Sequence, residues 1–269
     1  MPGFNSVSPQ QLSRLIGTPQ CPVILDARDD DDFAADPFLV PSARRIRAQD
    51  AATLATATAP RPAVVLCQKG RKLSEGVAAH LRCAGVAAES LEGGWLAWRE
   101  AALPAIPAAT LPVPGHGTVW VTRHRPKIDR IACPWLIRRF LDPEARFLYV
   151  APADVMDVAD RFRATPFDIE GVTFSHRGEL CSFDALIDDF GLRSGALDRL
   201  ATVVRGADTD RHDLAPQSSG LLALSVGMSR LYRNDIEQLE AGIALYDAFY
   251  RWARDGFDEG HDWPAGRQA

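Results

Sequence analysis

The sequence has little cysteine and no long hydrophobic run. Its five cysteines are widely spread and include no Cys-x-x-Cys pair, which argues against a disulfide framework or a cysteine-based zinc module and favours a reduced, cytoplasmic setting. No stretch approaches the roughly 20 apolar residues that cross a bilayer, and the N-terminus lacks the basic and apolar regions of a signal peptide. Without such a run no membrane is expected as a partner, and the net charge of −5 argues against nucleic acid.

The composition is that of a globular protein with room for two domains. The chain has 269 residues, of which 46% are hydrophobic and 24% charged. Residues 103–117 contain four prolines and two glycines, which sustain neither a helix nor a central strand. We therefore predict a first domain at 1–103, a semi-extended linker at 104–117, a second domain at 118–254 and a frayed polar tail at 255–269.

Before the linker, short apolar runs alternate with helical patterns. Residues 22–26 (PVILD) and 63–67 (AVVLC) read as buried parallel strands. Residues 8–16 begin with a serine N-cap followed by proline, and Leu73, Val77 and Leu81 recur every four positions, so both stretches are expected to be helical. The pattern predicts an α/β domain with a parallel sheet.

After the linker, the pattern changes to mostly helix. Residues 118–122 and 146–150 are strand candidates, and apolar stripes of helical period recur from residue 183 onward. A helix over 129–141 is expected to start near Cys133, because Pro134 breaks an earlier start. The second domain is therefore predicted to be mostly α-helical with a few strands.

Cys67 ends one of the predicted strands and precedes a loop rich in cations. A strand–loop–helix join directs backbone N–H groups at one point, where a tetrahedral oxyanion can bind. Nearby cations also favour the thiolate of a cysteine placed there. This chemistry suits attack on a sulfane sulfur, which leaves a persulfide on Cys67; the alternative is a non-catalytic thiol. The predicted anion cradle consists of Gln68, Lys69, Gly70, Arg71 and Lys72.

Three ordered motifs carry a resemblance to the rhodanese (sulfurtransferase) family over residues 6–102. They are VILDAR at 23–28, the Cys67 loop, and GGWLAW at 93–98. The resemblance implies a rhodanese-like fold and a catalytic Cys67, with Asp26 and Arg28 of the first motif in support. The chain departs from the family at 39–43 (LVPSA) and at Lys72, where arginine is common; these departures concern anion affinity and substrate choice rather than fold.

Two candidate sites stand out in the second domain. Residues 123–140 are strongly basic and predict either a solvated basic face or an oxyanion or nucleotide-phosphate site. A histidine and two carboxylates suit an open site for a divalent metal ion, although a histidine–glutamate pair alone is also common at surfaces and helix caps. The candidate anion-site residues are Arg123, His124 and Arg130, and the candidate metal ligands are His176, Glu179 and Asp208.

Residues 120–254 resemble the chromate-resistance family that includes the ChrB proteins. The matching stretches are 129–140 (DRIACPWLIRRF), 174–184, 206–216 and 245–248. The resemblance implies an association with chromate operons as a sensor, regulator or accessory protein.

Together these features predict a cytoplasmic rhodanese-type sulfurtransferase that forms a Cys67 persulfide, fused to a domain that binds an oxyanion or a metal. The expected partner is a small sulfur donor or an oxyanion, and the oligomeric state is left open. Two other hypotheses remain: a non-enzymatic chromate or redox sensor, and a metal-dependent enzyme centred on the second domain.

Overall fold

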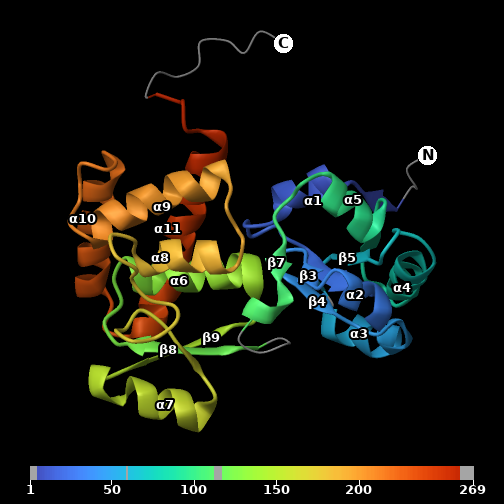
Figure 1. Cartoon of the computed structure of the whole chain (residues 1–269), viewed down its shortest axis with the longest axis horizontal. Coiled ribbons are helices and arrows are strands. Elements are labelled where there is room, and N and C mark those ends of the chain that lie inside the picture. Colours follow the sequence, from blue (N-terminus) through green and yellow to red (C-terminus); the bar gives the residue numbers. More distant parts are fainter. Residues whose placement is uncertain (1–4, 59, 112–116, 261–269) are drawn as a thin grey trace.

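The computed structural model describes residues 5–58, 60–111 and 117–260. Its first half, at the right of Figure 1, is built on a five-stranded sheet in which every pairing is parallel. The central strands are apolar because alternate residues pack into two different clusters, one on each face. This confirms the predicted α/β domain. In order across the sheet, the strands are β1 (Ser6–Val7), β6 (Ala88–Leu91), β5 (Ala63–Leu66), β2 (Val23–Asp26) and β4 (Ala43–Arg45).

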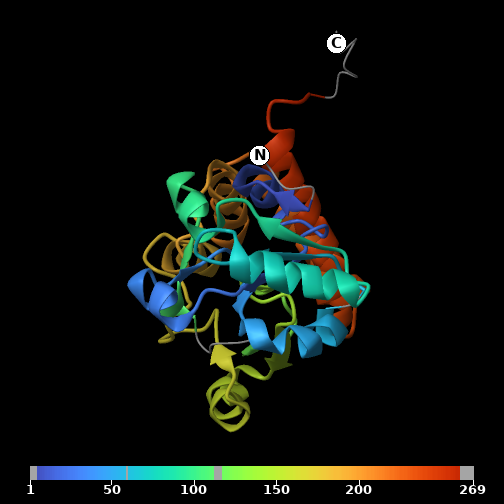
Figure 2. The same ribbon diagram turned by 90° about the vertical axis from the view of Figure 1, so that its right-hand side faces the viewer.

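Helices connect these strands and pack on the sheet. Helix α1 begins at a capping box in which Ser8 and Gln11 each accept a hydrogen bond from the other's backbone N–H. Helix α4 crosses the front of Figure 2 and buries Val77 and Leu81. The helical segments are α1 (Pro9–Leu15), α2 (Asp30–Ala35), η1 (Ala48–Asp50), α3 (Ala51–Thr58), α4 (Lys72–Cys83) and α5 (Gly94–Glu100).

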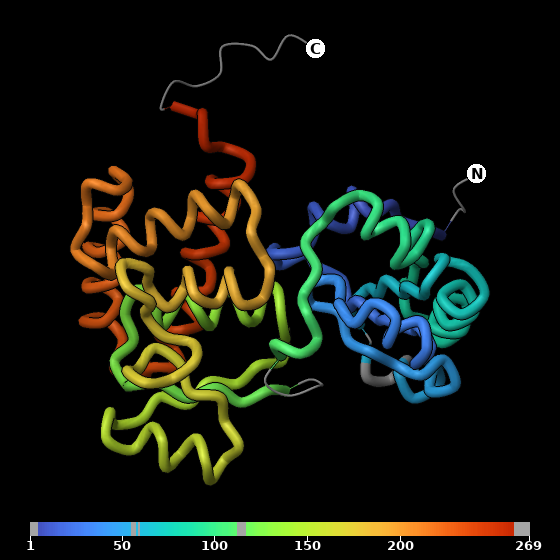
Figure 3. Tube along the Cα trace, viewed as in Figure 1, coloured from blue at the N-terminus to red at the C-terminus, as the bar shows by residue number. Residues whose placement is uncertain are grey.

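The proline-rich segment runs between the two halves, as the green part of the tube in Figure 3 shows. Its first part packs on the first half: β7 (Ile106–Pro107) pairs antiparallel with β3 (Phe38–Leu39), and the 3₁₀ turn η2 (Ala108–Thr110) follows. Residues 112–116, near the end of the predicted linker, lie outside the described residues.

The second half combines a three-stranded parallel sheet with a layer of helices, which confirms the mostly helical prediction. Helix α7 covers one face of the sheet, where Val155 and Ala159 pack on Val121. The other face carries Trp120 and Phe147 into the main core. The strands are β8 (Val119–Arg123), β9 (Arg146–Val150) and β10 (Thr165–Pro166). The helical segments are α6 (Asp129–Leu136), the π-helical turn η3 (Ile137–Leu141), the 3₁₀ turn η4 (Pro152–Asp154), α7 (Val155–Phe162), α8 (Ser182–Asp189), α9 (Gly195–Asp208), α10 (Gln217–Leu231) and α11 (Asp235–Asp255).

Helix α6 begins at Asp129, so the predicted start near Cys133 is wrong. Pro134 lies inside the helix and lacks the N–H that would bond to the carbonyl of Arg130. The hydroxyl of Tyr149, on β9, donates to that carbonyl at 2.8 Å instead. A tertiary hydrogen bond therefore replaces the missing helical one.

The two halves share one apolar core. The N–H of Ser42 donates to the carbonyl of Phe140 at 2.5 Å. Arg254 of α11 donates to the carbonyl of Arg14 of α1 at 2.7 Å. The halves are thus joined by a backbone hydrogen bond, a side-chain hydrogen bond and packing, as well as by the connecting segment.

Helix α11 is the longest described helix, at 21 residues. Across the described ranges, no helix combines the length and apolar character that spanning a bilayer requires. The predicted tail at 255–269 begins where this helix ends, and its residues 261–269 lie outside the described chain.

Candidate functional site

Cys67 lies directly after the central strand β5, at the carboxyl edge of the sheet. Its side chain is nearly buried, with 6% of the residue exposed. The sulfur is 3.2 Å from the hydroxyl oxygen of Ser74, in the first turn of α4. That hydroxyl also donates to the carbonyl of Arg71 at 3.0 Å. The thiol is therefore held between the end of a strand and the start of a helix, as the sequence predicted.

The backbone of the Cys67 loop is held against the start of α5. The N–H of Trp95 donates to the carbonyl of Cys67 at 2.9 Å, and the N–H of Leu96 donates to that of Gln68 at 3.1 Å. Gly94, with φ +60°, sits so close that a Cβ would strike the Cys67 carbonyl oxygen. The glycine pair of the third sequence motif thus permits a close backbone approach that fixes the loop.

The Cys67 loop and the start of α4 carry three cationic side chains. Lys69, Arg71 and Lys72 are all exposed, and none of them forms an ion pair with another residue in the described part of the chain. The side-chain oxygen of Gln68 is buried and accepts no hydrogen bond within those same ranges. The positive charge of the loop is therefore available to an anionic ligand.

Asp26 and Arg28 form a fully buried ion pair beneath this region, with 2.5 Å between Arg28 Nη2 and Asp26 Oδ2. Arg28 also donates to the carbonyls of Asp36 and Phe38 and stacks on Trp95, with 4.3 Å to the ring centroid. Trp95 follows the glycine pair and donates its N–H to the Cys67 carbonyl, so this ion pair packs against a residue that holds the loop.

A second cluster lies in the other half, where Asp129, Asp168, His176 and Asp208 converge from different segments. Asp129 begins α6 and Asp208 ends α9, while Asp168 follows β10. His176 Nε2 is 3.1 Å from Asp208 Oδ2 and 3.5 Å from both Asp129 Oδ2 and Asp168 Oδ1. One ligand atom each from Asp129, His176 and Asp208 lies within 4.8 Å of the others, a spacing that a metal ion could bridge.

Burial and mutual charge shift the protonation of this cluster. Burial raises the pKa of Asp129 well above its usual value, and the charges of Asp208 and Asp168 add to that effect. Hydrogen bonds to Asp168 and Asp208 raise the pKa of His176 to about 10. Burial would raise the pKa of Asp168 as well, but hydrogen bonds from His176 and Ser182 lower it overall.

The predicted metal set is assembled only in part. His176 and Asp208 meet, but the Glu179 side chain is 88% exposed and lies 3.9 Å from Arg211, outside the cluster. Residues 175–180 form bends and turns rather than a helix, so a spacing of three does not align the two side chains. Asp129 occupies the place expected for Glu179.

The predicted anion site in the second half also differs from expectation. Arg123 and Arg130 both pair with Asp168, at 3.1 and 3.3 Å, while His124 is exposed. The two arginines therefore neutralise an internal carboxylate, which lowers the charge that they offer to an external anion.

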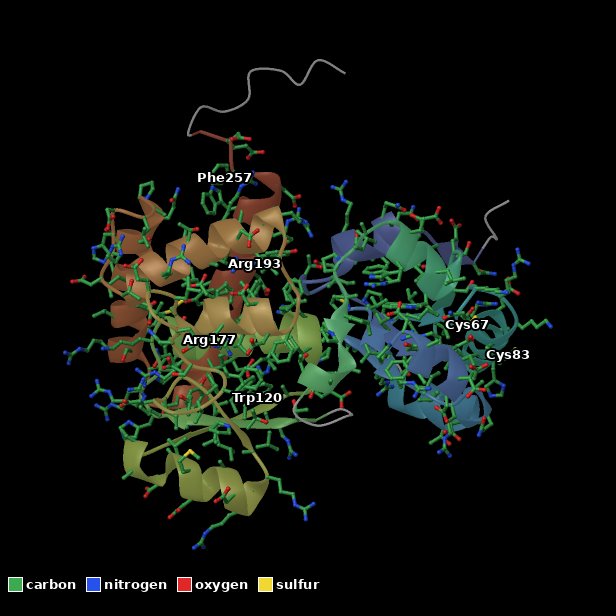
Figure 4. The ribbon with its side chains drawn as sticks, in the orientation of Figure 1. Cys67, Cys83, Trp120, Arg177, Arg193 and Phe257 are labelled. Carbon is green, nitrogen blue, oxygen red and sulfur yellow. The ribbon has the colours of Figure 1, made fainter. Side chains whose placement is uncertain are left out.

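Asp129 and Asp168 were not predicted from the sequence as members of the cluster. Asp129 opens the motif that carries the second resemblance, and that was the available signal. Asp168 stands in no motif. The two candidate sites are separate: Figure 4 shows Cys67 in one half and Arg177, which directly follows His176 in the chain, in the other.

Comparisons with known proteins divide the chain in the same way. Residues 8–101 match the family model of the rhodanese-like domain, and residues 120–253 match that of the ChrB C-terminal domain. Protein ChrB of Cupriavidus metallidurans is 36% identical over 140 residues, which make up 52% of this chain and 42% of that protein. The match thus spans less than half the length of that relative.

Solved structures also resemble part of the chain. A rhodanese-related protein from Thermoplasma volcanium is 17% identical and covers 38% of this chain and 98% of its own, with a TM-score of 0.33. A rhodanese-like domain protein from Staphylococcus aureus is 23% identical and covers 35% and 91%, with a TM-score of 0.32.

Proposed function

Because the chain joins a rhodanese-like domain to a ChrB C-terminal domain, we propose that it transfers sulfane sulfur through a persulfide on Cys67. The observation that carries this proposal is the position of the thiol, after a central parallel strand and beside three exposed cations without acidic partners among the described residues. The cations and the backbone N–H groups of such a loop suit a small anionic sulfur donor.

The transfer proceeds in two balanced steps. With thiosulfate as donor, the Cys67 thiolate attacks the outer sulfur, a new S–S bond forms, and sulfite leaves with the electron pair of the broken bond. A nucleophile such as cyanide then takes the outer sulfur, and Cys67 leaves as the thiolate. The Ser74 hydroxyl lies 3.2 Å from the sulfur and would donate a hydrogen bond to that thiolate once its O–H turns away from the carbonyl of Arg71.

The likeness of the second half to ChrB supports a biological setting for this chemistry, namely chromate resistance. The expected substrate is a small sulfur donor whose negative charge matches the cations of the loop. A host strain whose gene carries Cys67→Ser is expected to tolerate less chromate than a strain with Cys83→Ser.

The direct test is thiocyanate formation from thiosulfate and cyanide. Wild-type protein is expected to be active and to carry one extra sulfur atom on Cys67 by mass spectrometry after exposure to donor alone. Cys67→Ser should lose both signals. Cys83→Ser is the matched control, because Cys83 is exposed at the far end of α4. A wild-type protein inactive with thiosulfate, mercaptopyruvate and polysulfide would contradict the proposal.

A further inference from the structure

The second-half cluster has the spacing of a coordination sphere. Donor atoms bound to one ion at about 2.0–2.2 Å, in tetrahedral or octahedral geometry, lie about 2.8–3.6 Å from each other. His176 Nε2 lies 3.1 Å from Asp208 Oδ2 and 3.5 Å from Asp129 Oδ2. Neither distance requires the side chains to move far to share an ion.

Asp129 has an acceptor that the described chain leaves unused. The residue is 1% exposed, and its Oδ1 has no hydrogen-bond partner within the described residues. The N–H of Ser182 donates to Oδ2 at 2.6 Å and so orients the carboxylate beside His176. A buried carboxylate oxygen without a donor is unfavourable, and a cation bound by both oxygens of Asp129 would satisfy it.

The charge of the cluster also matches a divalent ion. Asp168 already pairs with Arg123 and Arg130 and accepts from the Ser182 hydroxyl at 2.8 Å. As metal ligands, Asp129 and Asp208 would be deprotonated and would supply two negative charges beside a single neutral imidazole. A divalent ion would balance them.

From these observations we propose that Asp129, His176 and Asp208 bind a divalent first-row transition-metal ion. An imidazole nitrogen with two carboxylate oxygens suits Zn²⁺, Fe²⁺ or Mn²⁺ better than Mg²⁺ or Ca²⁺. Three protein ligands leave coordination positions for water or substrate, as in catalytic metal sites. The His176 side chain is 41% exposed, so the site opens to solvent on that side. The proposal is independent of Cys67, which lies in the other half of the molecule (Figure 4).

The test is metal binding by the full-length protein after removal of metal with a chelator. Calorimetric titration with Mn²⁺, which thiolates bind weakly, is expected to show one ion per chain. A parallel titration uses Zn²⁺ with the Cys67→Ser protein, in which the Cys67 thiol cannot bind the ion. Asp208→Asn and His176→Gln should each weaken binding at least about tenfold. Glu179→Gln, three residues from His176 but outside the cluster, is the matched control and should bind like wild type.

Asp129→Asn is not the first choice, because a buried residue at a helix start also affects folding. Circular dichroism and thermal unfolding of the Asp208→Asn and His176→Gln proteins establish that they are folded. Wild-type protein that takes up neither ion would overturn the proposal. Unchanged affinity in folded Asp208→Asn would overturn it equally.

Discussion

The five cysteines of this chain differ mainly in what surrounds each thiol. Cys133 and Cys181 are completely buried, and Cys83 is exposed on α4. Cys67 is nearly buried but lies in a loop bordered by cations. Burial raises the pKa of Cys21 to about 11. Since all five residues are cysteines, differences in thiol reactivity must come from their surroundings.

Alkylation of the native protein tests this ranking. At pH 8, iodoacetamide is expected to label Cys83 quickly and Cys21 slowly, because a pKa of about 11 leaves roughly one Cys21 in a thousand as thiolate. Cys133 and Cys181 should react only after unfolding in urea. Peptide mass spectrometry over a time course measures the rates, and labelling of Cys21 as fast as that of Cys83 would refute the ranking.

The residues of the Cys67 site could be predicted from the sequence more completely than those of the second-half cluster. The Cys67 loop is contiguous, so strand, cations and helix appear in order along the chain. The second cluster draws on residues up to 79 positions apart, Asp129 and Asp208, whose meeting depends on the packing of α6, α8 and α9. Glu179 was chosen for its spacing from His176, which carries no information inside a turn.

At the scale of elements, α6 shows why the effect of Pro134 alone predicted the wrong helix start. Proline inside a helix removes one hydrogen bond and normally ends the helix. Here the deprived carbonyl, that of Arg130, receives the Tyr149 hydroxyl from the neighbouring strand β9. Tyr149 is 19 residues from Arg130 in the chain, so no helical pattern could have predicted this hydrogen bond. Strand and helix periodicity, in contrast, depend on neighbours in the chain and were predicted well.

Tyr149→Phe tests that compensation. Removing the hydroxyl leaves the Arg130 carbonyl without its donor, and the free energy of unfolding should fall by about 1–2 kcal/mol. Urea unfolding followed by circular dichroism measures the change. Tyr232→Phe is the control, because the Tyr232 hydroxyl makes no side-chain hydrogen bond within the described residues, and it should be near neutral. Equal effects in the two proteins would argue against the compensation.

At the scale of the molecule, the two halves pack against each other and share one apolar core. A proline-rich segment predicts separation, yet Ile16 and Trp98 of the first half share a core with Phe140 and Tyr250 of the second. These residues follow no sequence motif, since they face each other only after both halves have folded. A metal ion bound in the second half would consequently stabilise the first half as well.

Gly17 lies at the junction of the halves, and its replacement tests whether they unfold together. Gly17 has φ +80°, and a Cβ there would strike the Phe140 ring and lie 2.8 Å from Tyr250 Cε1. The Phe140 ring is confined by Trp135 and Tyr250, at 5.7 and 5.6 Å between ring centroids, so it cannot move aside freely.

Gly17→Ala is therefore expected to cost roughly 2–4 kcal/mol, the sum of backbone strain and overpacking. Gly171→Ala is the matched control, because Gly171 has φ +82° with no atom within 4 Å of the added Cβ, and it should cost only about 1 kcal/mol of backbone strain. Urea unfolding followed by tryptophan fluorescence reports on both halves, which each contain buried tryptophans: Trp95, Trp98, Trp120 and Trp135. Wild-type protein should unfold in one transition, and Gly17→Ala should lower its midpoint or split it. If Gly17→Ala and Gly171→Ala lost the same stability, the contact between the halves would not contribute to stability as argued.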